Sequence, residues 1–165
     1  MNQFAQFRIS CVEGALRGLD WLAQRRGRST DLPSHLETGI SGEDAAYFYL
    51  RRKGYTVVAR RWSSKRWRGD LDLIAWKEPF LCIIEVKTRT AHDLIPAEFA
   101  VDSKKRDVLR RLARQYVRQL PSPQPPPVRF DVISVYLVPG EEKEFHHFEG
   151  SFGWSEQEDW DRWDK

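Results

Sequence analysis

The chain has 165 residues, of which 41% are hydrophobic and 31% charged, and this length and balance suit one globular domain with extensions. It contains no apolar run of about 18 residues and no secretory signal, so we expect a cytoplasmic protein without a membrane span. The net charge of +3 is unevenly distributed, because residues 141–165 carry −6 and the rest of the chain carries +9. A basic body predicts a polyanionic partner, although a solvated surface would also explain the excess.

The first part of the chain divides into an extension and a core helix. Residues 1–38 are interpreted as an extension with a short amphipathic helix, and the Ser-, Thr-, Pro- and Gly-rich residues 27–38 are typical of a linker. Ser41 is a favourable N-cap and Gly54 a favourable C-cap. A core helix is therefore predicted between them.

The rest of the chain combines several strands with one long helix. The apolar pattern predicts strands over residues 55–61, 71–76, 80–87, 128–138 and 145–148. Before the fourth strand, Asp102 or Ser103 is expected to cap a helix whose apolar residues recur at helical spacing. This order predicts an α/β fold with a central mixed β-sheet flanked by helices over residues 39–152, followed by an acidic tryptophan-containing tail, residues 153–165.

Charged residues on two of the predicted buried strands are the strongest functional signal. Residues 69–75 read Gly-Asp-Leu-Asp-Leu-Ile-Ala, and residues 83–87 read Ile-Ile-Glu-Val-Lys. Burying an unpaired carboxylate is costly, so Asp72 and Glu85 are expected to have a partner or a function. Glu85 and Lys87 are two residues apart and therefore project from the same face of their strand. Two carboxylates and an amine at strand ends predict a divalent-metal site suited to phosphodiester hydrolysis.

The same residues carry a resemblance to a known family. The pattern Asp-x12-Glu-x-Lys on two adjacent strands resembles the PD-(D/E)XK nuclease superfamily, which has a restriction-endonuclease-like or Holliday-junction-resolvase-like fold. A longer ordered set over residues 39–152 resembles the YraN-like family of that superfamily. The set comprises Gly42-Glu43, Arg60-Arg61, residues 69–75, residues 85–89, Ala100-Val101 with Lys104 or Lys105, and Arg129-Phe130-Asp131-Val132. The chain departs from the family pattern at Asp70 and Arg61, where Glu and Asn are usual.

The resemblance implies a nuclease that depends on Mg²⁺ or Mn²⁺, with Asp72, Glu85 and Lys87 as catalytic residues. Asp72, Glu85 and the backbone carbonyl of Val86 would hold the metal. Lys87 would orient the attacking water or help to deprotonate it, and would offset charge in the transition state. Two further carboxylates are candidate secondary acids: Glu43 and Asp70.

Cations gather in two segments that flank the predicted metal site. The loop of residues 60–68 combines five cations with two indoles, and the predicted helix over residues 104–118 is also strongly basic. Arg and Lys neutralise phosphates, and Trp stacks on unpaired bases. Alternatively, the tryptophans pack locally and the cations form a solvated surface. The candidate nucleic-acid contacts are Arg60, Arg61, Lys65, Arg66, Arg68, Arg89, Lys104, Lys105, Arg110, Arg111 and Arg114.

These observations predict a metal-dependent endonuclease that hydrolyses DNA, with branched and single-stranded DNA among the candidate substrates. The alternatives are a nucleic-acid-binding module of the same fold without catalysis, or an adaptor protein that uses the N-terminal helix and the acidic tail. Asp131 is interpreted as a buried structural partner for an arginine rather than a catalytic acid. His146 and His147 are adjacent and face opposite sides of a strand, so they are poor joint metal ligands.

Overall fold

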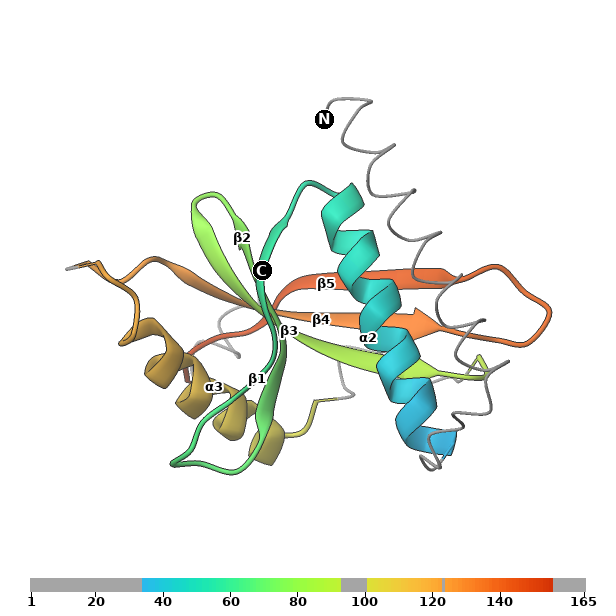
Figure 1. Ribbon diagram of the computed structural model, residues 1–165, viewed down its shortest axis with the longest axis horizontal. Helices are drawn as coiled ribbons and strands as arrows, with labels where there is room; N and C mark the ends of the chain where they lie inside the picture. Colours follow the sequence, from blue (N-terminus) through green and yellow to red (C-terminus); the bar gives the residue numbers. More distant parts are fainter. Residues whose placement is uncertain (1–33, 93–100, 123, 156–165) are drawn as a thin grey trace, which may run out of the picture.

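The computed structural model describes residues 34–92, 101–122 and 124–155. Its elements, in chain order, are α2 (Ser34–Arg52), β1 (Thr56–Ser63), β2 (Asp70–Lys77), β3 (Phe80–Arg89), α3 (Ser103–Val117), β4 (Val128–Tyr136) and β5 (Glu144–Phe152). The predicted α/β class, a mixed sheet flanked by helices, is confirmed (Figure 1). The helix predicted within residues 1–33 lies outside the described residues. Neither described helix is long and apolar enough to cross a membrane.

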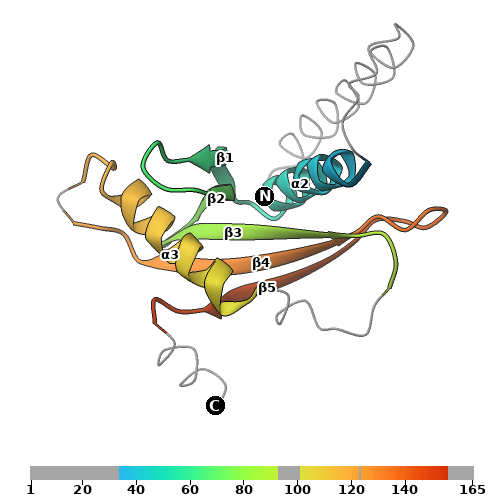
Figure 2. The same ribbon diagram turned by 90° about the horizontal axis from the view of Figure 1, so that it is seen from below.

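The five strands form one sheet in the order β1-β2-β3-β4-β5. Only β3 and β4 run parallel, and every other neighbouring pair is antiparallel. A parallel pair needs a long crossover connection, and α3 supplies it between β3 and β4. Figures 1 and 2 show β3, β4 and β5 running side by side, with the β1–β2 hairpin continuing the sheet beside α3.

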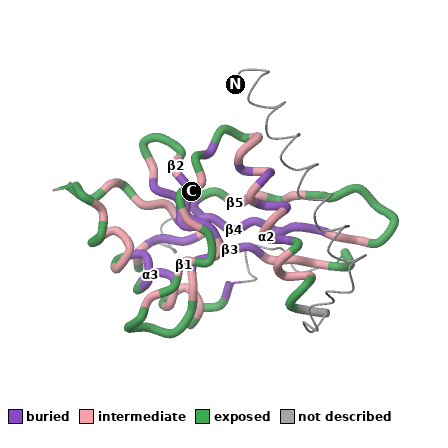
Figure 3. The backbone as a smooth tube through the Cα atoms, viewed as in Figure 1, coloured by how far each residue is buried: buried purple, intermediate pink, exposed green. Residues whose placement is uncertain are grey.

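Alternate residues of the central strands enter two separate cores. One core packs Ala46 and Leu50 of α2 against Ile84 of β3, and the other packs Leu109 and Leu112 of α3 against the opposite face of the sheet. The central strands are therefore covered on both faces, and Figure 3 shows burial continuing along β3 and β4. A strand covered on both faces reads as a nearly continuous apolar run, which makes a charged residue within it conspicuous.

Helix α2 begins earlier than predicted. It starts at Ser34, so Ser41 lies inside the helix and is not its N-cap, and the predicted linker ends before residue 38. Gly42 lies inside this longer helix and packs against β3, where a Cβ atom would stand 1.8 Å from Oγ1 of Thr88. The glycine in this position lets the helix approach the strand closely, and local capping signals do not report such an approach.

The other predicted helix ends are confirmed. Gly54 follows α2 with a φ of 82°, and the N–H of Tyr55 donates to the carbonyl of Leu50 at 3.0 Å, as in a glycine-terminated helix. At the start of α3, the Asp102 carboxylate accepts the N–H of Lys105 at 2.8 Å. This cap fixes the first turn of α3, which carries Lys105 towards the sheet.

Candidate active site

The candidate site lies where β2 and β3 separate. Their pairing runs from Lys77↔Phe80 to Leu73↔Ile84, although both strands continue beyond the last pair. We call this region the β2–β3 fork. Asp72 lies within it, and its Oδ2 accepts the backbone N–H of Val86 at 2.7 Å. The carboxylate of Asp72 therefore takes the place of a strand-to-strand hydrogen bond and is held against β3.

Glu85 is the buried acid of the fork, with only 3% of its surface exposed. The ammonium of Lys87, on the same strand face as predicted, lies 2.9 Å from Oε1 of Glu85. A second ammonium, that of Lys105 on α3, lies 3.0 Å from Oε2. This second contact is an ion pair without good hydrogen-bond direction, so Oε2 is buried without a well-formed hydrogen bond.

The charge of Glu85 perturbs Asp72. Burial, followed by the negative charge of Glu85, raises the pKa of Asp72 to about 7, against the opposing effects of the Val86 N–H and the Lys105 charge. Burial alone would lower the pKa of Lys105, but its close contact with the carboxylate of Glu85 outweighs it, and the pKa is raised. The fork therefore places Asp72 beside a second carboxylate in a poorly solvated site, as expected of a site built for a cation.

An open cavity of about 620 Å³ adjoins the fork. Asp72, Glu85, Val86 and Lys87 line it together with Glu43 from α2. Glu43 pairs with Arg61 of β1 at 2.5 Å, and its charge contributes to the raised pKa of Asp72. The structure thus brings the predicted secondary acid Glu43 to the site. The other one, Asp70, lies half-buried at the start of β2 and is not among the lining residues.

The chemistry of the fork fits a hard divalent cation. Carboxylate and carbonyl oxygens are the ligands that Mg²⁺ and Mn²⁺ prefer, and Mg²⁺ usually keeps several waters beside one or two carboxylates. Among the described residues, no three Asp, Glu, His or Cys side chains converge on one point. A cation at the fork would therefore have two carboxylate ligands, Asp72 and Glu85, and water would complete its coordination. The Val86 carbonyl is expected to face β2, because the N–H and C=O of one residue in an extended strand point the same way.

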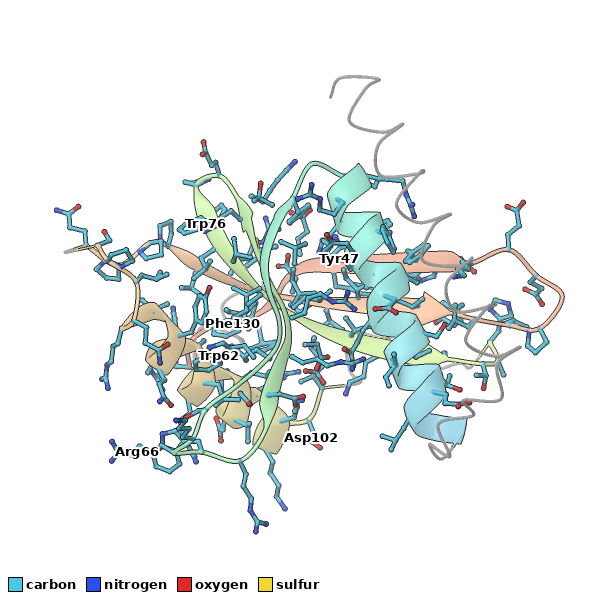
Figure 4. All side chains as sticks on the ribbon, viewed as in Figure 1. Tyr47, Trp62, Arg66, Trp76, Asp102 and Phe130 are labelled. Atoms are coloured by element: carbon cyan, nitrogen blue, oxygen red, sulfur yellow. The ribbon has the colours of Figure 1, made fainter. Side chains whose placement is uncertain are left out.

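Several of the predicted nucleic-acid contacts are exposed on one surface. Lys104, Arg111 and Arg114 are exposed and share one face of α3 by their spacing, and the exposed cations Lys65, Arg66 and Arg68 follow β1. Figure 4 shows Arg66 in the loop after β1. Trp67 is 39% exposed, and the Arg111 guanidinium lies over its ring at 4.7 Å from the centroid. We call the set Lys65, Arg66, Trp67, Arg68, Lys104, Arg111 and Arg114 the basic surface.

The loop that carries Trp67 is attached to α3. The hydroxyl of Ser64 donates to Gln115 at 2.7 Å, and the ring of Trp62 packs edge-on against Tyr116 with 5.3 Å between centroids. Gly69 has a φ of 102°, and a Cβ atom there would come within 2.9 Å of Val108. Trp62 therefore follows the local-packing alternative, whereas Trp67 presents part of its ring at the surface.

The remaining predicted contacts lie elsewhere. Arg110 is buried, with 4% exposed, and donates to the carbonyl of Gly153 at 2.8 Å and to Asp107 at 3.0 Å. Its assignment to the nucleic-acid surface was wrong, because it flanks the apolar stripe of α3 instead of facing outward. Arg60 pairs with Asp44 of α2, and Arg61 with Glu43.

Two other cations predicted to contact nucleic acid, Arg89 and Lys105, are only partly exposed. Arg89 is half-buried at the end of β3. Lys105 lies at the fork. It was predicted to contact nucleic acid, and its ion pair with Glu85 was not predicted. A spacing of twenty residues between Glu85 and Lys105 gives no local signal, because only the crossover brings α3 back to β3.

A second buried acid has the structural role predicted for it. Asp131 is fully buried, and Arg129 donates to both of its oxygens at 2.8 Å. It also accepts the Gly150 N–H at 2.8 Å and lies 3.1 Å from Nε2 of His147. Burial would raise the pKa of Asp131, but the hydrogen bonds with His147, Arg129 and Gly150 outweigh it and hold the pKa below its usual value.

The mixed sheet and its two flanking helices define a restriction-endonuclease-like α/β domain. The chain belongs to the UPF0102 family, described as an uncharacterised protein family, which matches residues 42–135. This family is part of the restriction-endonuclease-like superfamily, so the predicted YraN-like membership is confirmed.

Relatives from several bacteria support the assignment. A UPF0102 protein of Koribacter versatilis is 51% identical over 107 residues, which cover 65% of this chain and 73% of that relative. UPF0102 proteins of Solibacter usitatus and Porphyromonas gingivalis are 44% and 40% identical over 73% of this chain, covering 89% and 87% of their own lengths. The aligned regions establish the family, and its description as uncharacterised assigns no activity.

Proposed function

We propose that this protein is a metal-dependent endonuclease that hydrolyses DNA phosphodiester bonds. The observation that carries the proposal is the convergence of Asp72, Glu85 and Lys87 at the β2–β3 fork, beside an open cavity. A purely structural acid would be paired to completion, as Asp131 is. The fork instead leaves Asp72 with a raised pKa and Glu85 with a buried oxygen that lacks a well-formed hydrogen bond.

Each residue of the fork has a distinct role in the proposal. Mg²⁺ held by Asp72, Glu85 and the Val86 carbonyl would supply a more acidic water and neutralise charge on the phosphate. Lys87 is held by Glu85 at the cavity wall, where its ammonium can orient a water and offset negative charge in the transition state. Glu43 is close enough to influence Asp72 electrostatically, and we assign it to ordering water in the cavity.

The basic surface is the proposed path for the DNA backbone. It runs along α3 from Lys104, next in sequence to the fork residue Lys105, to Arg114. Exposed arginines and lysines bind phosphates without reading sequence, and the ring of Trp67 can stack on an unpaired base. If about five phosphates are contacted, the logarithm of the association constant should fall with the logarithm of salt concentration with a slope of about −4.5.

The test is a cleavage assay with defined substrates. Purified protein is incubated with linear duplex, single-stranded, flapped and four-way-junction DNA, in Mg²⁺, in Mn²⁺ and in EDTA. We expect cleavage of at least one substrate with metal and none in EDTA. Asp72→Asn and Glu85→Gln should abolish cleavage while DNA binding persists, and Lys87→Ala should remove most of the rate. Asp107→Asn, which changes an exposed acid paired with Arg110, is the matched control and should cut normally.

The alternatives give different outcomes in the same assay. Salt-dependent DNA binding without cleavage in any metal would indicate a binding module of the same fold. A protein that neither binds DNA nor binds a divalent metal in its presence would overturn the proposal and favour an adaptor.

A further inference from the structure

Glu85 is paired with two ammonium groups, one on each of its carboxylate oxygens. Lys87 reaches Oε1 at 2.9 Å, and Lys105 reaches Oε2 at 3.0 Å. Resting on the proposed function, we propose that Lys105 occupies the cation position in the metal-free protein. A divalent metal displaces its ammonium from Glu85, and Lys105 then becomes available to a DNA phosphate.

The charges at the fork favour such an exchange. In the metal-free protein, the carboxylates of Asp72 and Glu85 face the ammonium groups of Lys87 and Lys105, so the formal charges balance. Adding a divalent cation with both ammonium groups in place would leave an excess of positive charge near a residue that is only 3% exposed. Like charges in a poorly solvated site repel strongly, and outward movement of one ammonium relieves this repulsion.

The two lysines are not equivalent. Lys87 lies on β3 two residues from Glu85, within the sheet, and its ammonium makes a proper hydrogen bond with Oε1. Lys105 reaches across from the first turn of α3, and its contact leaves Oε2 without a well-formed hydrogen bond. Oε2 is therefore the oxygen with the weaker interaction, and the ammonium that departs most easily is that of Lys105.

The surroundings of Lys105 give the released ammonium a place to go. Its side chain is already 30% exposed, and a lysine stem can keep its carbons against the protein while its head moves into solvent. The preceding residue, Lys104, is exposed and belongs to the basic surface. Lys105 would thus join a phosphate-binding set only when the metal is bound, which couples metal binding to DNA binding. By linkage, DNA should tighten metal binding by the same factor.

The decisive experiment measures metal affinity and not cleavage. Mn²⁺ is titrated calorimetrically into metal-free wild type, Lys105→Met, Lys105→Arg and Lys104→Met, at constant pH and salt. We expect Lys105→Met to bind Mn²⁺ more tightly than wild type by at least about tenfold, which corresponds to roughly 1.4 kcal/mol. Lys104→Met is the matched control, because it removes the same charge from the neighbouring position, and its affinity should stay within about twofold of wild type. Lys105→Arg should behave like wild type.

A second measurement tests the coupling and guards against misfolding. Mn²⁺ affinity is repeated with a bound oligonucleotide carrying non-hydrolysable linkages, which should tighten binding in wild type and much less in Lys105→Met. Thermal melting with EDTA and with Mn²⁺ shows whether each variant is folded. If Lys105→Met is the one variant that fails to fold, Lys105→Gln is used in its place.

The outcomes separate this inference from the nuclease proposal. Mn²⁺ binding to wild type with unchanged or weaker binding to Lys105→Met overturns the exchange and leaves the nuclease proposal standing. Binding to Lys105→Met but not to wild type supports the exchange, since it shows that the ammonium blocks the site. Binding to neither protein, with or without the oligonucleotide, overturns both.

Discussion

Two buried carboxylates on neighbouring strands, Glu85 and Asp131, differ in how completely their oxygens are hydrogen-bonded. Glu85 of β3 is paired in register with Val132 of β4, the residue after Asp131, so the two acids are close along the sheet but face opposite cores. Asp131 receives hydrogen bonds from a guanidinium and a backbone N–H, and its pKa is lowered. At the fork, the charge of Glu85 helps to raise the pKa of Asp72 to about 7.

The difference separates an acid whose partners are complete from one whose partners are not. Burial is common to both sites and decides nothing. What differs is how completely the protein supplies partners. Arg129 holds Asp131 with two bonds and also pairs with Glu149 at 2.8 Å, which closes a network on the α2 face of the sheet. At the fork, the partners are two lysine ammonium groups and one N–H, and an open cavity adjoins them.

The largest expected effect tests this difference through stability. Asp131→Asn should lower the free energy of unfolding by about 3–5 kcal/mol, because it leaves the Arg129 guanidinium without its charged partner in a buried network. Asp72→Asn should not lower stability and should raise it at neutral pH, since it removes the buried charge that Glu85 repels. Urea unfolding of both variants in EDTA measures the two effects. A loss of similar size in Asp72→Asn would show that the fork is a structural ion-pair network.

The pH dependence of stability should also differ between the two acids. The pKa of Asp72 rises from 3.8 to about 7 on folding, so this group destabilises the metal-free protein as pH increases through that window, by about 4 kcal/mol in the limit. Asp131 acts in the opposite sense: its lowered pKa gives stability above about pH 4, which is lost as pH falls through the folded value.

Unfolding curves between pH 4 and 8 in EDTA check the sign. Wild type should lose stability between about pH 4 and 7 relative to Asp72→Asn, and saturating Mn²⁺ should remove the difference in slope. Identical pH profiles for wild type and Asp72→Asn would contradict the raised pKa.

Much of this fold follows from local patterns. The apolar runs located the five described strands, and their charged interruptions pointed to Asp72, Glu85 and Lys87, which the structure brings together at the fork. Gly54 and Asp102 marked helix ends correctly, because capping depends on residues next to each other in the chain.

What the sequence did not predict concerns contacts between distant segments. Helix α2 packs on β3 through the close approach of Gly42 to Thr88, and the position of Lys105 depends on the crossover that returns α3 to β3. Arg60 was predicted from its charge to contact nucleic acid, and its pairing with Asp44 of α2, sixteen residues earlier, was not predicted. Residue type and spacing along the chain contain no information about such partners.

The smallest predicted effect applies the same comparison to arginines. Arg110 has partners inside the protein, whereas Arg111 and Arg114 lie exposed beside aromatic rings. Replacing Arg111 and Arg114 together with Gln should make the salt slope of DNA binding less steep by about 2, with stability unchanged within about 0.5 kcal/mol. Arg110→Gln should leave the slope unchanged but cost about 1–3 kcal/mol, because it removes a buried hydrogen bond to Gly153. Binding curves at several salt concentrations and urea unfolding distinguish them. If Arg110→Gln reduced the slope without loss of stability, its side chain would face DNA, and the division between inner and outer arginines would be wrong.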